Sequence, residues 1–119
     1  EKNPVTSDPN RYARTLAIVE ADPSIGVGGP TIGWVNAAMR ASGRMAQPDF
    51  AGLVPIPTLM VLAGAESIVS NNAAEDLSRR VKTTAHLRIP GARHEILMER
   101  NEFRDQFWVA FDAFIQGRS

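Results

Sequence analysis

Two side chains suited to acid–base chemistry follow apolar stretches of this sequence. His94 lies in "GARHEILMER", three residues after Gly91, and Glu66 lies in "GAESIVS", two residues after Gly64. An imidazole exchanges a proton near neutral pH, and a carboxylate beside it fixes its tautomer and stabilises its protonated form. The two residues therefore indicate the acid–base half of a catalytic triad, provided that the fold brings them together.

The elements around these residues predict that they meet. "TLMVLAG" (58–64) is a continuous apolar run of strand length, typical of a strand buried on both faces, and "AHLRIPG" (85–91) is a second short strand. Apolar spacing predicts helices over 71–82 and 101–117, so the last seventy residues have a strand–helix–strand–helix pattern and a parallel strand pair. Catalytic and ligand-binding residues of parallel sheets lie just beyond the carboxyl ends of the strands, so Glu66 and His94 should project from one edge of the sheet.

The first part of the sequence has a different character. A loop precedes a helix over 9–22, with Ser7 or Asp8 as its cap, and Thr31 can cap a second helix over 32–46. A segment rich in Gly and Pro joins the two helices, and further prolines mark a loop at 48–57. We therefore predict two units, residues 1–47 and residues 48–119.

Composition excludes several classes of protein. The 119 residues are 44% hydrophobic and 22% charged, with thirteen basic and thirteen acidic residues and no Cys. This balance gives no reason to expect a nucleic-acid partner, and no apolar run is long enough to cross a membrane. The sequence begins with neither a Met nor an apolar leader, so we expect a processed product or a piece of a longer protein, located in the cytoplasm.

The stretches "PIPTLMVLAGAESIVS" and "GARHEILMERNEFRDQFWVAFDAFI" resemble the C-terminal end of α/β-hydrolases, above all the serine hydrolases of the lysophospholipase and monoacylglycerol-lipase type. In that family the triad acid follows one strand and the His follows the next. The matching residues are Glu66 and His94, which lie 28 positions apart. The resemblance implies an incomplete α/β-hydrolase domain, with residues 1–47 as part of a helical cap and 48–119 as the end of the core. It also implies a lipid-like or small ester substrate and no cofactor or metal.

The sequence departs from the family at two points. The acid is Glu66 where Asp is usual, and the extra methylene moves the carboxylate by about 1.5 Å. The family's nucleophile lies in a G-x-S-x-G turn, which does not occur in this sequence. The resemblance therefore places the nucleophile in a missing N-terminal half, and we expect the chain alone to be inactive. Without that half bound to it, we expect the chain to self-associate through its unpaired strand edge.

Alternative interpretations stay open. A non-catalytic binding or scaffold module, an epoxide hydrolase and a dehalogenase are all compatible with the residues present. His86 is expected to be structural, and Glu95 is expected in the first turn of a helix rather than in a metal site with Glu99 and His94. The aromatic stripe of 101–117 is expected to pack on the sheet. Three apolar residues of the second helix could line an acyl pocket or pack against the body: Ile32, Trp34 and Met39.

Overall fold

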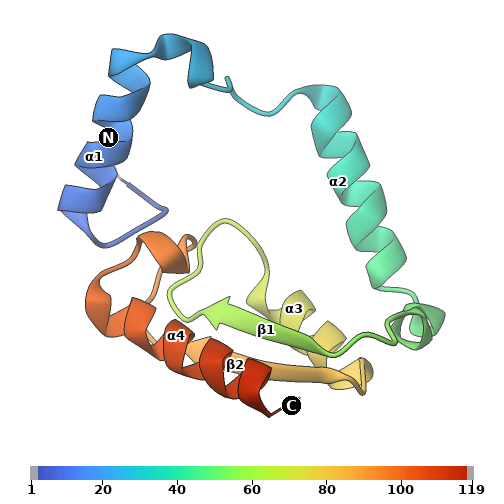
Figure 1. Cartoon of the computed structure of the whole chain (residues 1–119). Coiled ribbons are helices and arrows are strands. Elements are labelled where there is room, and N and C mark those ends of the chain that lie inside the picture. Colours follow the sequence, from blue (N-terminus) through green and yellow to red (C-terminus); the bar gives the residue numbers. More distant parts are fainter. Residues whose placement is uncertain (1–2, 118–119) are drawn as a thin grey trace.

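A computed structural model describes residues 3–117 and contains the predicted elements in the predicted order (Figure 1). The helices and strands are α1 (Pro9–Ala21), α2 (Ile32–Met45), β1 (Thr58–Ala63), α3 (Asn71–Arg80), β2 (Thr84–Ile89) and α4 (Asn101–Gln116). Short 3₁₀ helices lie at η1 (Pro23–Ile25), η2 (Pro48–Leu53) and η3 (Ile96–Met98). No helix among the described residues is long and apolar enough to span a membrane.

The two strands form a parallel sheet with helices on both faces. Their register runs from Thr58 opposite Thr84 to Ala63 opposite Ile89. Figure 1 shows α4 in front of the strands and α3 behind them. Contacts agree, because Arg88 pairs with Glu75 of α3 while Ala85, on the other face of β2, lines a hollow with α4. The predicted strand–helix–strand–helix arrangement is therefore confirmed.

Side-chain caps mark where α1 and α2 begin. The carboxylate of Asp8 accepts hydrogen bonds from the N–H groups of Asn10 and Arg11, and the hydroxyl of Thr31 accepts one from Trp34. Asp8 rather than Ser7 is therefore the cap of α1.

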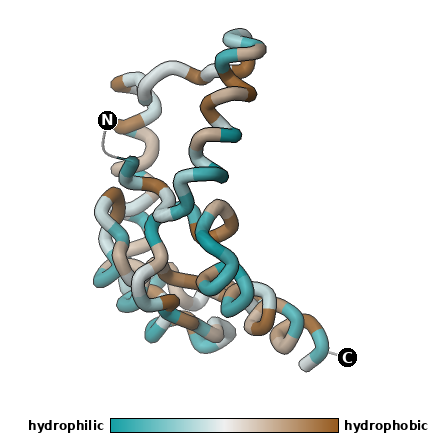
Figure 2. The backbone as a smooth tube through the Cα atoms, turned by 90° about the vertical axis from the view of Figure 1, so that its left-hand side faces the viewer, coloured by the Kyte–Doolittle hydropathy of each residue, from teal (hydrophilic) through white to brown (hydrophobic). Residues whose placement is uncertain are grey.

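Helices α1 and α2 rise from the sheet-bearing part as two separate arms, joined at their far ends by residues 22–31 (Figure 1). Neither helix contains a buried residue. Hydrophobic residues occur along both arms and the segment between them (Figure 2), and Val27 is 96% exposed. Their assignment to one cap unit, 1–47, stays a prediction.

The core is small, and four of its five residues lie at or just beyond the carboxyl ends of the strands, whereas Val81 precedes β2. Its buried apolar residues are Leu62, Ala63, Val81, Ile89 and Ala92. The prediction that 58–64 is buried on both faces is wrong for most of β1, because its first four residues, 58–61, are only half-buried. The reason is that β1 has one strand neighbour among the described residues, and α3 and α4 cover only part of each face.

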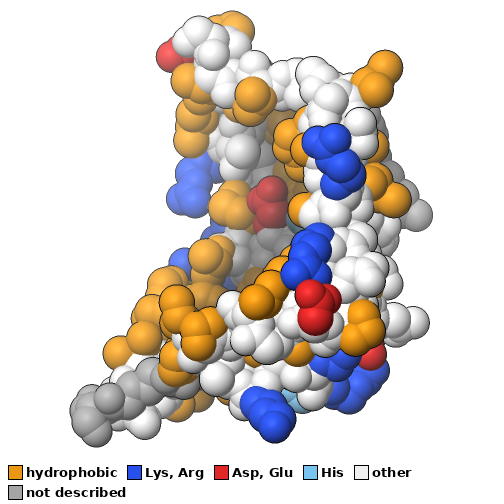
Figure 3. Space-filling view, turned by 90° about the vertical axis from the view of Figure 1, so that its right-hand side faces the viewer, with side chains coloured by type: hydrophobic (Ala, Val, Ile, Leu, Met, Phe, Trp, Pro, Cys, Tyr) orange, Lys and Arg blue, Asp and Glu red, His pale blue; other side chains and the backbone are white. Residues whose placement is uncertain are grey.

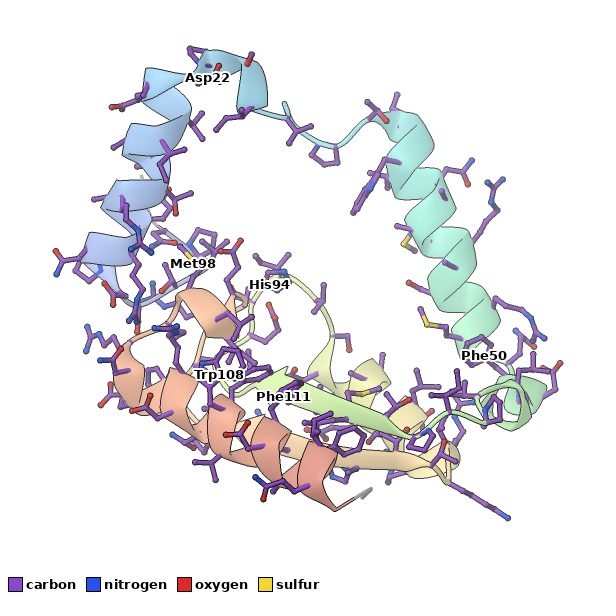
Figure 4. All side chains as sticks on the ribbon, viewed as in Figure 1. Asp22, Phe50, His94, Met98, Trp108 and Phe111 are labelled. Carbon is purple, nitrogen blue, oxygen red and sulfur yellow. The ribbon has the colours of Figure 1, made fainter. Side chains whose placement is uncertain are left out.

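The aromatic stripe of α4 packs on the sheet only in part. Phe103, Phe107 and Phe114 are half-buried, whereas Trp108 and Phe111 are exposed. The rings of Phe107 and Phe111 stack with their centroids 6.0 Å apart, and Trp108 meets both of these rings edge-on (Figure 4). The stripe therefore forms a contact with the sheet and an aromatic surface beside it.

Gly64 lets the two strand ends approach each other closely. Its N–H donates to the carbonyl of Ile89 at 2.8 Å, and the N–H of Ala65 donates to the carbonyl of Ala92 at 2.8 Å. A Cβ at Gly64 would lie 2.6 Å from the oxygen of Ile89 and 2.7 Å from Cα of Pro90. The pairing thus continues past both strands and brings the loops of Glu66 and His94 side by side.

Replacing Gly64 with Ala should therefore destabilise the full-length parent protein by about 2 to 3 kcal/mol, because the methyl group collides with rigid backbone. Urea unfolding measures this loss. Gly43→Ala is the matched control, since nothing lies within 4 Å of its Cβ position and an Ala inside α2 should be neutral or slightly stabilising. Equal stability of the Gly64→Ala and wild-type proteins would contradict the close approach.

Candidate active site

The structure brings Glu66 and His94 together, as the sequence predicted. Oε2 of Glu66 lies 2.7 Å from Nδ1 of His94, with the Glu66 side chain 5% exposed and the His94 side chain 35% exposed. Figure 4 shows His94 beside the loop that follows β1, on the side of the sheet from which α1 and α2 rise. The pair therefore lies at the carboxyl ends of parallel strands, which is the usual location of an active site in such a sheet.

The carboxylate of Glu66 is held by its own loop. Its Oε1 accepts the backbone N–H groups of Ser67 at 2.8 Å, Ile68 at 2.6 Å and Val69 at 3.3 Å. Burial acts to raise the pKa of Glu66, but the hydrogen bonds from Ile68 and His94 lower it more, so that it lies below its ordinary value. Glu66 is therefore ionised at neutral pH, and its carboxylate reaches Nδ1 of His94 at 2.7 Å.

This ionised carboxylate determines the tautomer of His94. Because a carboxylate can only accept, Nδ1 of His94 carries the proton and Nε2 presents its lone pair. Among residues 3–117, no group forms a hydrogen bond with Nε2. The arrangement can therefore accept a proton at Nε2 and stabilise the resulting imidazolium through Glu66.

A second buried carboxylate, Glu99, lies close to the site and has no counterpart in the sequence-based predictions. It is 0% exposed and accepts hydrogen bonds from Ser7, Arg93 and Arg100. Burial acts to raise the pKa of Glu99, but the hydrogen bond from the Ser7 hydroxyl and those from backbone N–H groups lower it more. No local sequence pattern marks this residue, because two of the four hydrogen bonds to its carboxylate come from Ser7, 92 positions away.

The expectation for Glu95 is wrong. Glu95 is exposed and precedes η3, whereas α4 begins only at Asn101. The N–H of Glu95 donates to the carbonyl of Val5 at 2.8 Å, so this residue pairs with the first segment of the chain instead of lying in a helical turn. His86 lies in β2 and is exposed.

The predicted pocket residues of α2 are exposed, at 90% for Ile32, 64% for Trp34 and 68% for Met39. A mainly apolar hollow of about 370 Å³ lies between the end of α2 and α3, on the face shown in Figure 3, and contains none of these three residues. Its lining residues include Val69 and Ser70, which continue the loop of Glu66. A role for Ile32, Trp34 and Met39 in binding substrate stays a prediction.

The two lowered carboxyl pKa values predict a stability loss in acid. Glu66 and Glu99 both titrate below the ordinary value of 4.5 when folded, so the unfolded chain binds more protons as the pH falls. The free energy of unfolding of the parent should therefore decrease below about pH 5 and continue to fall until the pH passes the folded-state pKa values. Urea unfolding at several pH values measures this slope. In Glu99→Gln the free energy of unfolding should depend less steeply on pH. A pH dependence identical to that of the wild type would contradict the lowered pKa of Glu99 in the folded protein.

A parallel strand pair between helices, with an acid and a His at adjacent strand ends, has the arrangement of an α/β-hydrolase core. Residues 2–101 match the family described as serine aminopeptidase, S33, and the chain belongs to this family of α/β-hydrolases. The predicted family and fold class are thus confirmed.

Two named relatives cover nearly all of the chain. Lysophospholipase L2 of Escherichia coli is 34% identical over 120 residues, which cover 95% of this chain and 34% of that protein. Probable lysophospholipase L2 of Haemophilus influenzae is 29% identical over 119 residues, which cover 100% of this chain and 37% of that protein. The chain spans about a third of the length of these relatives. No solved structure matches it.

Proposed function

We propose that the parent protein is a serine hydrolase of lysophospholipids, monoacylglycerols or related carboxylic esters, and that Glu66 and His94 supply the acid and base of its triad. The observation that carries this proposal is the 2.7 Å pair between Oε2 of Glu66 and Nδ1 of His94, with no hydrogen bond to Nε2 from any of residues 3–117. The names of the two bacterial relatives support the substrate class. A cytoplasmic location is part of the same proposal.

In the proposed reaction Nε2 of His94 moves the protons, while Nδ1–H stays bonded to Glu66. Nε2 takes the proton of a serine hydroxyl as the serine oxygen attacks the ester carbonyl, while Glu66 holds Nδ1–H and stabilises the imidazolium. The imidazolium then gives its proton to the leaving alcohol. Water hydrolyses the acyl-serine by the same route in reverse, and the carboxylic acid leaves.

The serine of this proposal lies in a G-x-S-x-G turn outside the 119 residues, because the sequence contains no such motif. The proposed partner of the chain is therefore the rest of its own parent. The edge of β1 that β2 leaves unpaired is the surface for it, since a strand edge exposes free backbone N–H and C=O groups. An Asp in place of that serine would instead indicate an epoxide hydrolase or a dehalogenase.

A substrate panel tests the proposed function. The full-length parent is assayed with p-nitrophenyl esters, monoacylglycerol and lysophospholipid, and with aminoacyl anilides because the family description names an aminopeptidase. We expect ester turnover well above anilide turnover. Preferential anilide cleavage would overturn the ester assignment, and no turnover of any substrate would favour a non-catalytic binding or scaffold module.

The purified 119-residue chain should show no ester turnover above background, because no G-x-S-x-G serine is present to be activated. The assay uses p-nitrophenyl acetate and compares the chain with its His94→Ala variant. Size-exclusion chromatography with light scattering should show self-association through β1 when the rest of the parent is absent. Turnover that disappears in the His94→Ala chain would contradict the proposed location of the nucleophile.

A further inference from the structure

Glu99 is the buried charged residue that the proposed reaction does not use. Its side chain is 0% exposed, and no salt bridge of the described residues includes it. Burying an unpaired carboxylate is costly unless hydrogen bonds satisfy its oxygens. The hydrogen-bond donors to the Glu99 carboxylate therefore show which segments of the chain this residue connects.

Both oxygens of Glu99 are fully engaged. Oε1 accepts from the backbone N–H of Ser7 at 3.0 Å and from that of Arg93 at 2.8 Å. Oε2 accepts from the hydroxyl of Ser7 at 2.5 Å and from the N–H of Arg100 at 3.2 Å. One carboxylate thus joins the segment before α1, the residue preceding His94 and the residue preceding α4.

Neighbouring contacts reinforce the same junction. The hydroxyl of Thr6 donates to the carbonyl of Met98 at 2.8 Å, and a guanidinium nitrogen of Arg93 donates to the carbonyl of Asn3 at 2.7 Å. On the other side of His94, the N–H of Glu95 donates to the carbonyl of Val5 at 2.8 Å. The backbone is therefore held immediately before and immediately after His94.

We infer that Glu99 is a positioning residue for His94, which keeps the imidazole at hydrogen-bonding distance from Glu66 by fixing the backbone at Arg93. This inference rests on the proposed function. Among the residues that the structure describes, Glu66 is the one hydrogen-bond partner of the His94 ring, so the position of the ring depends on the backbone that carries it. A displacement of about 1 Å is enough to cost roughly 100-fold in rate.

Glu99→Gln in the full-length parent tests the inference. The NH₂ group of the amide would face the backbone N–H of Arg100 or of Arg93, and two donors cannot form a hydrogen bond with each other. The contacts around residue 99 should therefore loosen, although the side-chain volume stays the same. We expect kcat for p-nitrophenyl ester hydrolysis to fall about 10- to 100-fold, with KM nearly unchanged. Glu95→Gln is the matched control, because Glu95 adjoins His94 but is exposed, and it should keep wild-type kcat.

A second readout does not depend on turnover. The Nδ1–H proton shared by His94 and Glu66 should give a far-downfield proton NMR resonance in the parent, assigned by its loss in Glu66→Gln. Glu99→Gln should lose or broaden this resonance, and Glu95→Gln should retain it. If wild type hydrolyses no ester but Glu99→Gln still removes the resonance, the proposed function fails and the positioning role stands.

A folded Glu99→Gln protein that keeps either the resonance or wild-type kcat overturns the inference, as does the absence of the resonance from wild type. If Glu99→Gln does not fold, the Ser7→Ala variant tests the inference instead. This variant removes the hydroxyl hydrogen bond and should lower kcat about 3- to 10-fold, roughly the value of one hydrogen bond. Ser7→Thr should restore the rate, because it keeps the hydroxyl. Wild-type kcat and resonance in Ser7→Ala would overturn the inference.

Discussion

Replacement of His94 by Ala in the full-length parent should lower kcat for ester hydrolysis by about 10⁴- to 10⁶-fold, which is the cost of removing the base of a serine triad. The reason lies in the geometry around the ring. Nε2 is the proton acceptor that the pair with Glu66 leaves open, and no other imidazole is available at the site, since His86 lies in β2. KM should change little, because in the proposed reaction the imidazole acts on the reacting atoms rather than on the body of the substrate.

The control is His86→Ala, which removes the other His of the chain from an exposed position and should leave kcat at the wild-type value. Steady-state kinetics with p-nitrophenyl butyrate, after circular dichroism has shown that both variants fold, provide the comparison. Retention of more than about a tenth of wild-type kcat by His94→Ala would remove His94 from the catalytic role.

Replacement of Glu66 by Gln should lower kcat by about 10³- to 10⁴-fold. The amide can still accept from Nδ1–H or from the loop, but it has no charge to stabilise the imidazolium, and its NH₂ group favours the wrong tautomer of His94. The carboxylate is 5% exposed and its Oε1 accepts three backbone N–H groups, so no water or neighbouring acid can readily replace it.

The conservative change Glu66→Asp distinguishes the effect of the negative charge from the effect of side-chain length. It keeps the charge but shortens the side chain by about 1.5 Å, so we expect an intermediate loss of kcat. Glu102→Gln, an exposed change in the first turn of α4, is the matched control and should be silent. If Glu66→Gln and Glu102→Gln had equal kcat, the structural pair would have no part in the chemistry.

Local signals explain why much of the fold could be predicted from the sequence. The apolar runs, the capping residues Asp8 and Thr31 and the glycines after each strand act over a few positions, and the elements that they predict are present. The meeting of Glu66 and His94 followed from the parallel pairing of two adjacent strands. Gly64 allows this meeting, because its lack of a side chain lets the strand ends touch.

The features that sequence reasoning missed depend on contacts between distant segments. The burial of Glu99 involves Ser7, 92 positions away, and Glu95, which was expected in the first turn of a helix, instead donates its N–H to the carbonyl of Val5. The partial burial of β1 depends on how many strands lie beside it. No periodicity or local motif carries this information.

Covalent labelling tests the central claim most directly. The full-length parent is treated with a fluorophosphonate, which reacts with an activated serine, and the modified peptide is identified by mass spectrometry. We predict a single labelled serine in a G-x-S-x-G turn outside these 119 residues, with labelling slowed by at least about 10³-fold in His94→Ala. A labelled serine within the 119 residues, or labelling that proceeds at the wild-type rate without His94, would contradict it.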